Sequence, residues 1–92
     1  MRRFDFTTLR VFVAIADERS LTRAAEREHL ALAAVSKRVS DLEAQLGISL
    51  LYRQPKGVEL TPAGHALLHH ARTVLDNLRQ MNADLSKHRR MS

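Results

Sequence analysis

The sequence predicts a mainly α-helical fold of three helices and a two-stranded β ribbon, followed by one long helix. Three observations support this prediction. Apolar residues recur at helical spacing in four segments, and residues that cap helices precede three of them, at Asp5, Ser20 and Thr61. A short alternating stretch around a turn at 54–57 predicts the ribbon. Beyond residue 62 the apolar positions alternate by four and three without a break, which predicts a single long helix.

The first helix is predicted to begin after Asp5 and to run over 6–18. Its apolar face consists of Leu9, Phe12, Val13 and Ala16, with Phe6 and Ile15 near the edges. A β-strand is the alternative, since Val11, Val13 and Ile15 are β-branched. The N-cap and the helical spacing favour the helix.

Two further helices are predicted close together. Residues 21–28 form the second helix behind a serine N-cap, and two adjacent alanines in it would let another helix pack at close range. The third helix, 32–46, ends at Gly47, a residue typical of the left-handed position after a helix. Short helical segments joined by about three residues have the layout of a helix-turn-helix, here at about 21–40.

The third helix has two different faces. An apolar stripe that we expect to face the core consists of Val35, Val39, Leu42 and Leu46. The opposite face carries small or hydroxylated side chains and one cation: Ala33, Ser36, Lys37, Ser40 and Ala44. A surface with so few long side chains fits closely against the floor of a DNA major groove. An amphipathic core helix with an inert outer face is the alternative, and the neighbouring segments favour the DNA-binding interpretation.

The segment after the third helix predicts a β-hairpin, or wing, at about 49–60. The alternation places Ile48, Leu50 and Tyr52 on one side and Ser49, Leu51 and Arg53 on the other. The turn Gln54-Pro55-Lys56-Gly57 has a cation on each side of its tip. An isolated two-stranded ribbon is marginally stable, so we expect it to pack against the helices. The side chains expected to do so are Leu50, Val58 and Leu60.

Thr61 and Pro62 pair an N-cap with a proline at the first helical position, which is a strong helix-start signal. We expect this helix over 62–88, with a disordered tail at 89–92. Its apolar stripe consists of Leu67, Ala71, Val74, Leu78, Met81 and Leu85. Such a long stripe predicts a homodimer joined through this helix, and the alternative is a helix folded back onto its own domain. The pattern leaves open whether the paired helices run parallel or antiparallel.

Composition limits the classes of function. The 92 residues suffice for one small domain, and a formal net charge of +5 favours a polyanionic partner such as nucleic acid. The sequence contains no Cys, which excludes disulfides and fits a reducing cytoplasm. We find neither an apolar run long enough to span a membrane nor a signal-peptide pattern, so we expect a cytoplasmic protein without a membrane partner.

Neither an enzyme nor a metalloprotein is predicted. The sequence has no Gly-rich phosphate loop, no HExxH and no GxSxG motif. His65 and His69 lie one helical turn apart, and His70 adjoins them. Zinc needs three or four ligands, and exposed histidines on a helix are the commoner case, so we expect no metal and no cofactor.

Short motifs recur along the chain in the order of the predicted elements. They are Leu9-Arg10 with Phe12-Val13, Ser20-x-Thr22-x-Ala24-Ala25, Ala34-Val35-Ser36-Lys37, Leu42-Glu43-x-x-Leu46-Gly47, Leu50-Leu51-x-Arg53 and Gly57-Val58-x-Leu60-Thr61-x-Ala63-Gly64. In these motifs the chain resembles the N-terminal DNA-binding region of LysR-type transcriptional regulators, without gaps from about Phe4 to Leu85. The resemblance implies a winged helix-turn-helix over 4–61 and a linker helix that forms dimers. The recognition helix, about 32–46, would enter the major groove, and the wing would contact the backbone or the minor groove.

The resemblance and the residue types together indicate the DNA contacts and the partners. The expected DNA-binding residues are Leu32, Ala33, Ser36, Lys37, Ser40, Arg53, Lys56 and Thr22. The resemblance implies double-stranded promoter or operator DNA read as an inverted repeat, a second copy of the chain, and tetramers of an intact bacterial regulator. A small-molecule effector would act only through a C-terminal sensory domain that this sequence does not include.

Two departures from the family pattern concern the recognition helix and its surroundings. Where the family often has Ser-Gln-Pro, this chain has Ala31-Leu32-Ala33, so the helix lacks a side-chain cap and an amide for adenine, although a leucine can contact a thymine methyl group. Glu28 replaces a buried leucine and must turn to solvent or find a partner. The alternatives to this function are a winged-helix module that binds protein and a stand-alone small regulator without a sensory domain.

Overall fold

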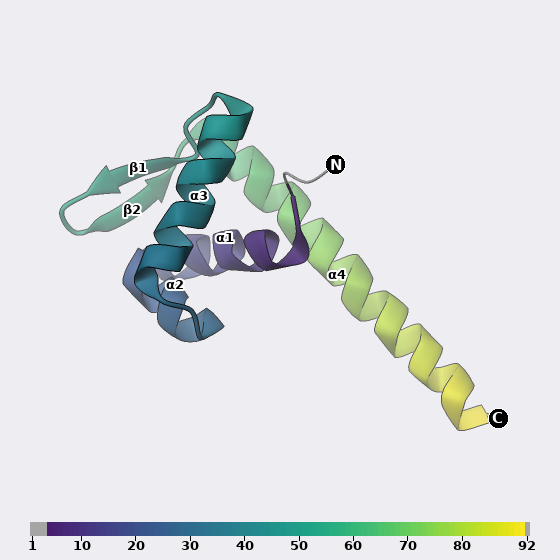
Figure 1. The fold of residues 1–92 in the computed structure, drawn as a ribbon. Coiled ribbons are helices and arrows are strands. Elements are labelled where there is room, and N and C mark those ends of the chain that lie inside the picture. The colour runs from purple at the N-terminus through teal and green to yellow at the C-terminus, as the bar shows by residue number, and fades with distance from the viewer. Residues whose placement is uncertain (1–3, 92) are drawn as a thin grey trace.

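The computed structural model describes residues 4–91 and the side chains of residues 4–89. In that range the elements are α1 (Phe6–Glu18), α2 (Leu21–Glu28), α3 (Leu32–Leu46), β1 (Leu51–Gln54), β2 (Gly57–Leu60) and α4 (Pro62–Met91). The antiparallel β1–β2 ribbon projects on one side of the first three helices, and α4 projects on the other (Figure 1). The fold is therefore the predicted winged helix-turn-helix followed by a long helix.

Polar caps begin three of the helices as predicted. Asp5, Ser20 and Thr61 each accept a hydrogen bond from the backbone N–H three residues later, at 2.7, 3.1 and 3.0 Å respectively. Each bond satisfies a donor that the helix itself leaves unpaired. The exception is α3, whose N-cap residue Ala31 makes no side-chain hydrogen bond to the helix.

The core is aliphatic, with one phenylalanine. Its largest fully buried side chains are Phe12, Ile15, Leu50, Val11, Val35 and Val39. The central element is α1, which contacts α2, α3, α4 and β2. The predicted face of α1 was therefore too narrow. Val11, Ala14 and Ile15 are fully buried although they lie outside that face or at its edge, and Phe6 is 51% exposed. A helix that other elements contact from several sides buries more than one stripe.

Residues of β1 alternate between the two faces of the ribbon as predicted, but the face that packs on the helices is the one that carries Leu51. Leu51 lies opposite Leu60, and residues opposite each other share a face of the ribbon. Val58, two residues before Leu60, is on the same face, and Leu51 and Val58 are both buried against the helices. Tyr52 lies on the outer face and is 53% exposed, so its predicted grouping with Leu50 was wrong. Leu50 is buried as expected, but it precedes β1.

The ribbon is attached to the end of α1 by a close backbone contact. The N–H of Val58 donates to the carbonyl of Arg19, at 3.2 Å. Gly57 has a φ of 145°, and a Cβ at this position would lie 2.5 Å from the Arg19 carbonyl oxygen. The wing can therefore approach α1 only because residue 57 is glycine.

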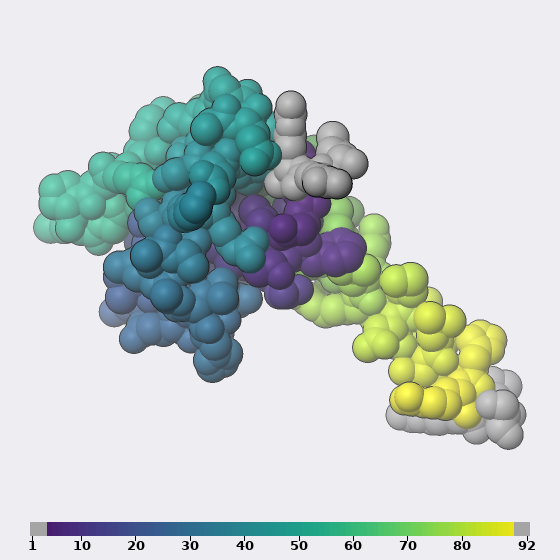
Figure 2. Space-filling model, in the orientation of Figure 1, coloured from purple at the N-terminus to yellow at the C-terminus, as the bar shows by residue number. Residues whose placement is uncertain are grey.

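The long helix α4 packs on the domain only through its first turns. Ala71 is 1% exposed and Leu67 is half-buried, so these two members of the predicted dimer stripe are largely covered by their own chain. The later turns extend away from the rest of the molecule (Figure 2). The helix continues to Met91, past the predicted end at 88, and Ser92 of the predicted tail lies outside the described residues. No helix in the described part of the chain is both long and apolar enough to cross a membrane.

Candidate DNA-binding surface

The outer face of α3 is exposed as predicted. Ala33, Lys37 and Ser40 are exposed, Ser36 is half-buried, and Leu32 is 46% exposed at the first turn. Atoms of α3 form part of the face turned to the viewer in Figure 2. The opposite side of the helix is buried against the core, which fixes the orientation of the exposed face.

The structure brings the other predicted contacts together beside α3. A groove between the start of α2 and the wing is lined in part by Thr22, Arg53 and Lys56. The Arg53 guanidinium also donates to the Ser40 hydroxyl of α3, at 3.4 Å. We refer to the combined set as the α3–wing surface. It consists of Thr22, Leu32, Ala33, Ser36, Lys37, Ser40, Arg53 and Lys56.

Lys37 is held only loosely on this surface. Its Nζ lies 2.8 Å from the Asp41 carboxylate, and the two side chains are 75% and 54% exposed. Water screens such a pair, so that it contributes about 0.5 kcal/mol or less to stability. Lys37 can therefore exchange this carboxylate for a phosphate or a guanine edge at small cost.

Glu43 positions the wing relative to α3, and sequence reasoning assigned it no role. Its Oε2 accepts hydrogen bonds from the N–H of Leu50 at 2.7 Å, the N–H of Leu51 at 3.3 Å and the hydroxyl of Ser49 at 3.4 Å. These groups lie in the segment that leads from α3 into β1. Any residue type can supply a backbone N–H donor, so the sequence does not show which residues bond to Glu43. The Leu42-Glu43 motif was the only sequence feature that pointed to this residue.

A second set of contacts attaches α3 to the start of α1. The Arg38 guanidinium donates to the Thr8 hydroxyl at 3.2 Å and lies 3.6 Å from the Asp5 carboxylate. The backbone hydrogen bond from Thr8 is the main reason that the pKa of Asp5 lies below its ordinary value, and Arg38 lowers it further.

Ion pairs on Asp17 join three helices. The carboxylate accepts hydrogen bonds from Arg27 of α2 at 3.0 Å and from Arg72 of α4 at 2.7 Å. Partial burial raises the pKa of Asp17, but the two guanidinium groups outweigh this effect and hold the pKa below 3.8. The hydrogen bond between Arg27 and Asp17 also raises the pKa of Arg27. Asp17 thus links the long helix to the helix-turn-helix.

Glu28, which was expected to turn to solvent or to pair with another side chain, forms ion pairs with two arginines. Its carboxylate lies 3.7 Å from Arg10 and 3.9 Å from Arg27, and its side chain is 20% exposed. The cost of partial burial is therefore offset by two cations.

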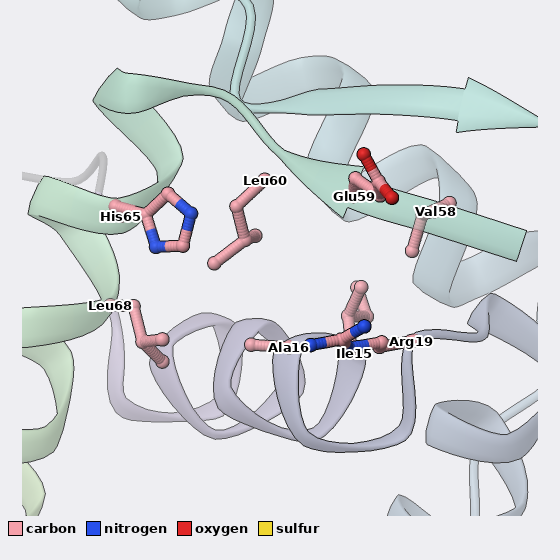
Figure 3. Close-up of a pocket in the computed structure, with 8 residues that line it drawn as sticks. All are labelled: Ile15, Ala16, Arg19, Val58, Glu59, Leu60, His65 and Leu68. Carbon is pink, nitrogen blue, oxygen red and sulfur yellow. The ribbon is translucent and has the colours of Figure 1, made fainter.

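A hollow between α1, β2 and the first turns of α4 involves none of the residues of the α3–wing surface (Figure 3). His65 lines it, together with Arg19 and Glu59. His69 and His70 instead contact each other edge to face, with ring centroids 5.2 Å apart. Within the described residues, no three His, Cys, Asp or Glu side chains are grouped closely enough to hold a metal ion.

The family described as bacterial regulatory helix-turn-helix proteins, lysR family, matches residues 6–65 of this sequence. The chain belongs to the LysR family. Among LysR-type relatives it is similar to the HTH-type transcriptional regulator TcbR of Pseudomonas sp. strain P51, with 40% identity over 72 residues. It is also similar to the RuBisCO operon transcriptional regulator of Allochromatium vinosum, with 48% identity over 73 residues. The matched segments cover 78% and 79% of this chain but 24% of each relative, so the chain spans about a quarter of their length.

Solved structures of LysR-type DNA-binding domains have the same fold. The complex of the BenM DNA-binding domain with catB site 1 DNA matches with a TM-score of 0.85 and 36% identity, over 91% of this chain and 94% of that one. The complex of the CbnR DNA-binding domain with DNA matches with a TM-score of 0.80 and 38% identity, over 91% and 95% of the two chains. These matches confirm the predicted family and the predicted fold.

Proposed function

We propose that this chain is the DNA-binding part of a longer bacterial transcriptional regulator that binds double-stranded DNA sequence-specifically. The observation that carries the proposal is the α3–wing surface, an exposed helix face with small side chains bordered by Arg53 and Lys56. Two domains of the same fold have been solved in complexes with DNA. The proposed activity is binding and not catalysis, and a regulator of chromosomal genes would act in the cytoplasm.

In this proposal each part of the surface has a separate role. The outer face of α3 enters the major groove, where Ser36 and Lys37 contact base edges or phosphates. Arg53 and Lys56 contact the backbone or the adjacent minor groove, and the Thr22 hydroxyl donates to a phosphate. The position of Thr22 in one groove with the wing cations supports this assignment.

A salt titration of DNA binding tests the proposal. Affinity for a duplex selected from a random pool should fall linearly with salt on logarithmic axes. Lys37→Ala and Lys56→Ala should each weaken binding and reduce the slope by about 0.9 for each phosphate that the variant no longer neutralises. Lys87→Ala, near the far end of α4, removes the same charge and should change little. Unchanged affinity and slope in both test variants would remove these residues from the site.

We also propose a homodimer that forms through the C-terminal part of α4. Val74, Met81 and Leu85 are 38%, 54% and 62% exposed, and Leu78 is half-buried. A stripe of this length in water favours a second apolar surface, and the simplest one is another copy of the chain. The dimer would present two copies of α3 to the half-sites of an inverted repeat. In an intact regulator, a C-terminal domain would bind the effector and dimers would associate into tetramers.

Sedimentation velocity tests the dimer. Met81→Glu places a carboxylate within the stripe and should shift the protein to the monomer, because an unpaired charge in an apolar contact is costly. Asn82→Glu introduces the same charge beside the stripe and should leave the dimer intact. A wild-type chain that sediments as a monomer at every concentration would contradict this part of the proposal, whatever the outcome of the DNA titration.

A further inference from the structure

We infer that Leu32 recognises the C5-methyl group of a thymine in each half-site. The inference rests on the proposed function, because it requires α3 to lie in the major groove. It assigns a base to a residue of the α3–wing surface that has no separate role in the proposed function.

The position of Leu32 makes it available to DNA and not to the core. It is the first residue of α3 and is 46% exposed. Leu30, two residues earlier, packs against the core, whereas Leu32 is absent from that cluster. The N-terminal residues of a recognition helix are those that contact base edges in helix-turn-helix complexes. An apolar side chain is therefore exposed where base contacts are made.

The neighbours of Leu32 offer no hydrogen bonds to a base edge from their side chains. Ala31, Ala33 and Ala34 are all exposed, and none carries a polar side-chain atom. The first side chain of α3 with a donor is Ser36, about one helical turn further along. A base edge that faces Leu32 and lies beyond reach of Ser36 would thus give up its bound water without gaining a polar side-chain partner.

Only one base presents an apolar group in the major groove. Thymine carries a C5-methyl group there beside its O4 acceptor, whereas guanine, cytosine and adenine present only hydrogen-bonding atoms, which Leu32 cannot satisfy. When a thymine faces Leu32, the leucine side chain and the methyl group pack together and exclude water from each other's surface. Burial of one methyl-sized group corresponds to about a fourfold change in affinity.

The test compares thymine with deoxyuridine, which lacks only the methyl group. A duplex selected by the chain from a random pool is resynthesised with each thymine replaced singly by deoxyuridine, and binding is measured by fluorescence anisotropy at constant salt. We expect one position in each half-site at which the replacement weakens binding about fourfold. Leu32→Ala should bind the thymine duplex and the duplex with deoxyuridine at that position equally. Ile48→Ala, an exposed apolar residue just beyond the opposite end of α3, should retain the fourfold difference.

The outcomes separate this inference from the proposed function. If the wild-type chain binds selected DNA but no thymine is sensitive to removal of its methyl group, the inference is wrong and the proposed function stands. The same conclusion follows if Leu32→Ala keeps the full difference between thymine and deoxyuridine. If no duplex is bound at low salt, the proposed function fails and the inference fails with it. The comparison on the wild-type chain needs no variant, so it does not depend on the folding of Leu32→Ala.

Discussion

Replacing Glu43 by alanine should loosen the wing and destabilise the whole domain. Three hydrogen bonds end on one oxygen of this carboxylate, and the shortest comes from the N–H of Leu50 at 2.7 Å. Leu50 is 1% exposed, so its N–H would be left without a partner in buried surroundings. An unsatisfied buried donor costs about 1–3 kcal/mol, and the longer bonds from Leu51 and Ser49 add less. We expect a total decrease of about 2–3 kcal/mol in the free energy of unfolding.

Urea denaturation followed by circular dichroism measures this decrease. A change of that size should lower the melting temperature by about 10–20 °C in a domain of this length. Hydrogen exchange offers a local measurement, because the amides of Leu50 and Leu51 should lose protection before the amides in the middle of α1. Glu43→Gln retains an acceptor oxygen without the charge and should give an intermediate decrease.

Glu26→Ala is the matched control. It removes the same charge from an exposed position on α2, and the side chain of Glu26 makes no hydrogen bond or ion pair with any described residue. Its effect should stay within about 0.5 kcal/mol. If Glu43→Ala is no more destabilising than this control, water replaces the carboxylate and the assigned role of Glu43 is refuted.

Three further predictions concern the wing, the recognition helix and the link to α4. Gly57→Ala should destabilise the domain by about 1–3 kcal/mol, because a Cβ there would lie 2.5 Å from the Arg19 carbonyl oxygen; an unchanged urea midpoint would contradict the close contact. Ala31→Ser should add the missing cap of α3 and raise stability by about 0.5–2 kcal/mol, which thermal melting can measure; a lower melting temperature would argue against it. Asp17→Asn should cost about 1 kcal/mol at pH 7, because it breaks two exposed ion pairs. The folded-state pKa of Asp17 is depressed, so its contribution is complete above its ordinary value of 3.8 and is lost as the pH falls through the lower, folded value. Urea midpoints of wild type and variant should therefore converge below pH 3.8, and a constant difference would disprove the linkage.

Much of the fold was predictable because helix caps act over very short distances. Asp5, Ser20 and Thr61 each bond to a backbone N–H three residues away, so their roles follow from neighbouring residues alone. Gly47 at the end of α3 has a φ of 67°, as its position predicted. The two faces of α3 were also predictable, because a single helix spacing separates them.

The sequence suggested the individual residues of the candidate site, but not how they lie next to one another on the surface. Nothing in the sequence states that Thr22 of α2 lies in one groove with Arg53 and Lys56, or that Arg53 bonds to Ser40. These contacts depend on how the helix-turn-helix and the wing pack together. Glu43 was assigned no role for the same reason, since its partners are backbone groups beyond the end of its own helix.

The sequence by itself determined the order of the elements, the start of each capped helix and the exposed face of α3. Only the tertiary structure decided that α1 is buried on several sides, that Leu51 and not Tyr52 faces the helices, and that Ala71 is covered by its own chain. The physical reason is that periodicity reports how one element divides its own apolar and polar residues. Burial depends on which other elements cover that element, and those lie far away in the chain.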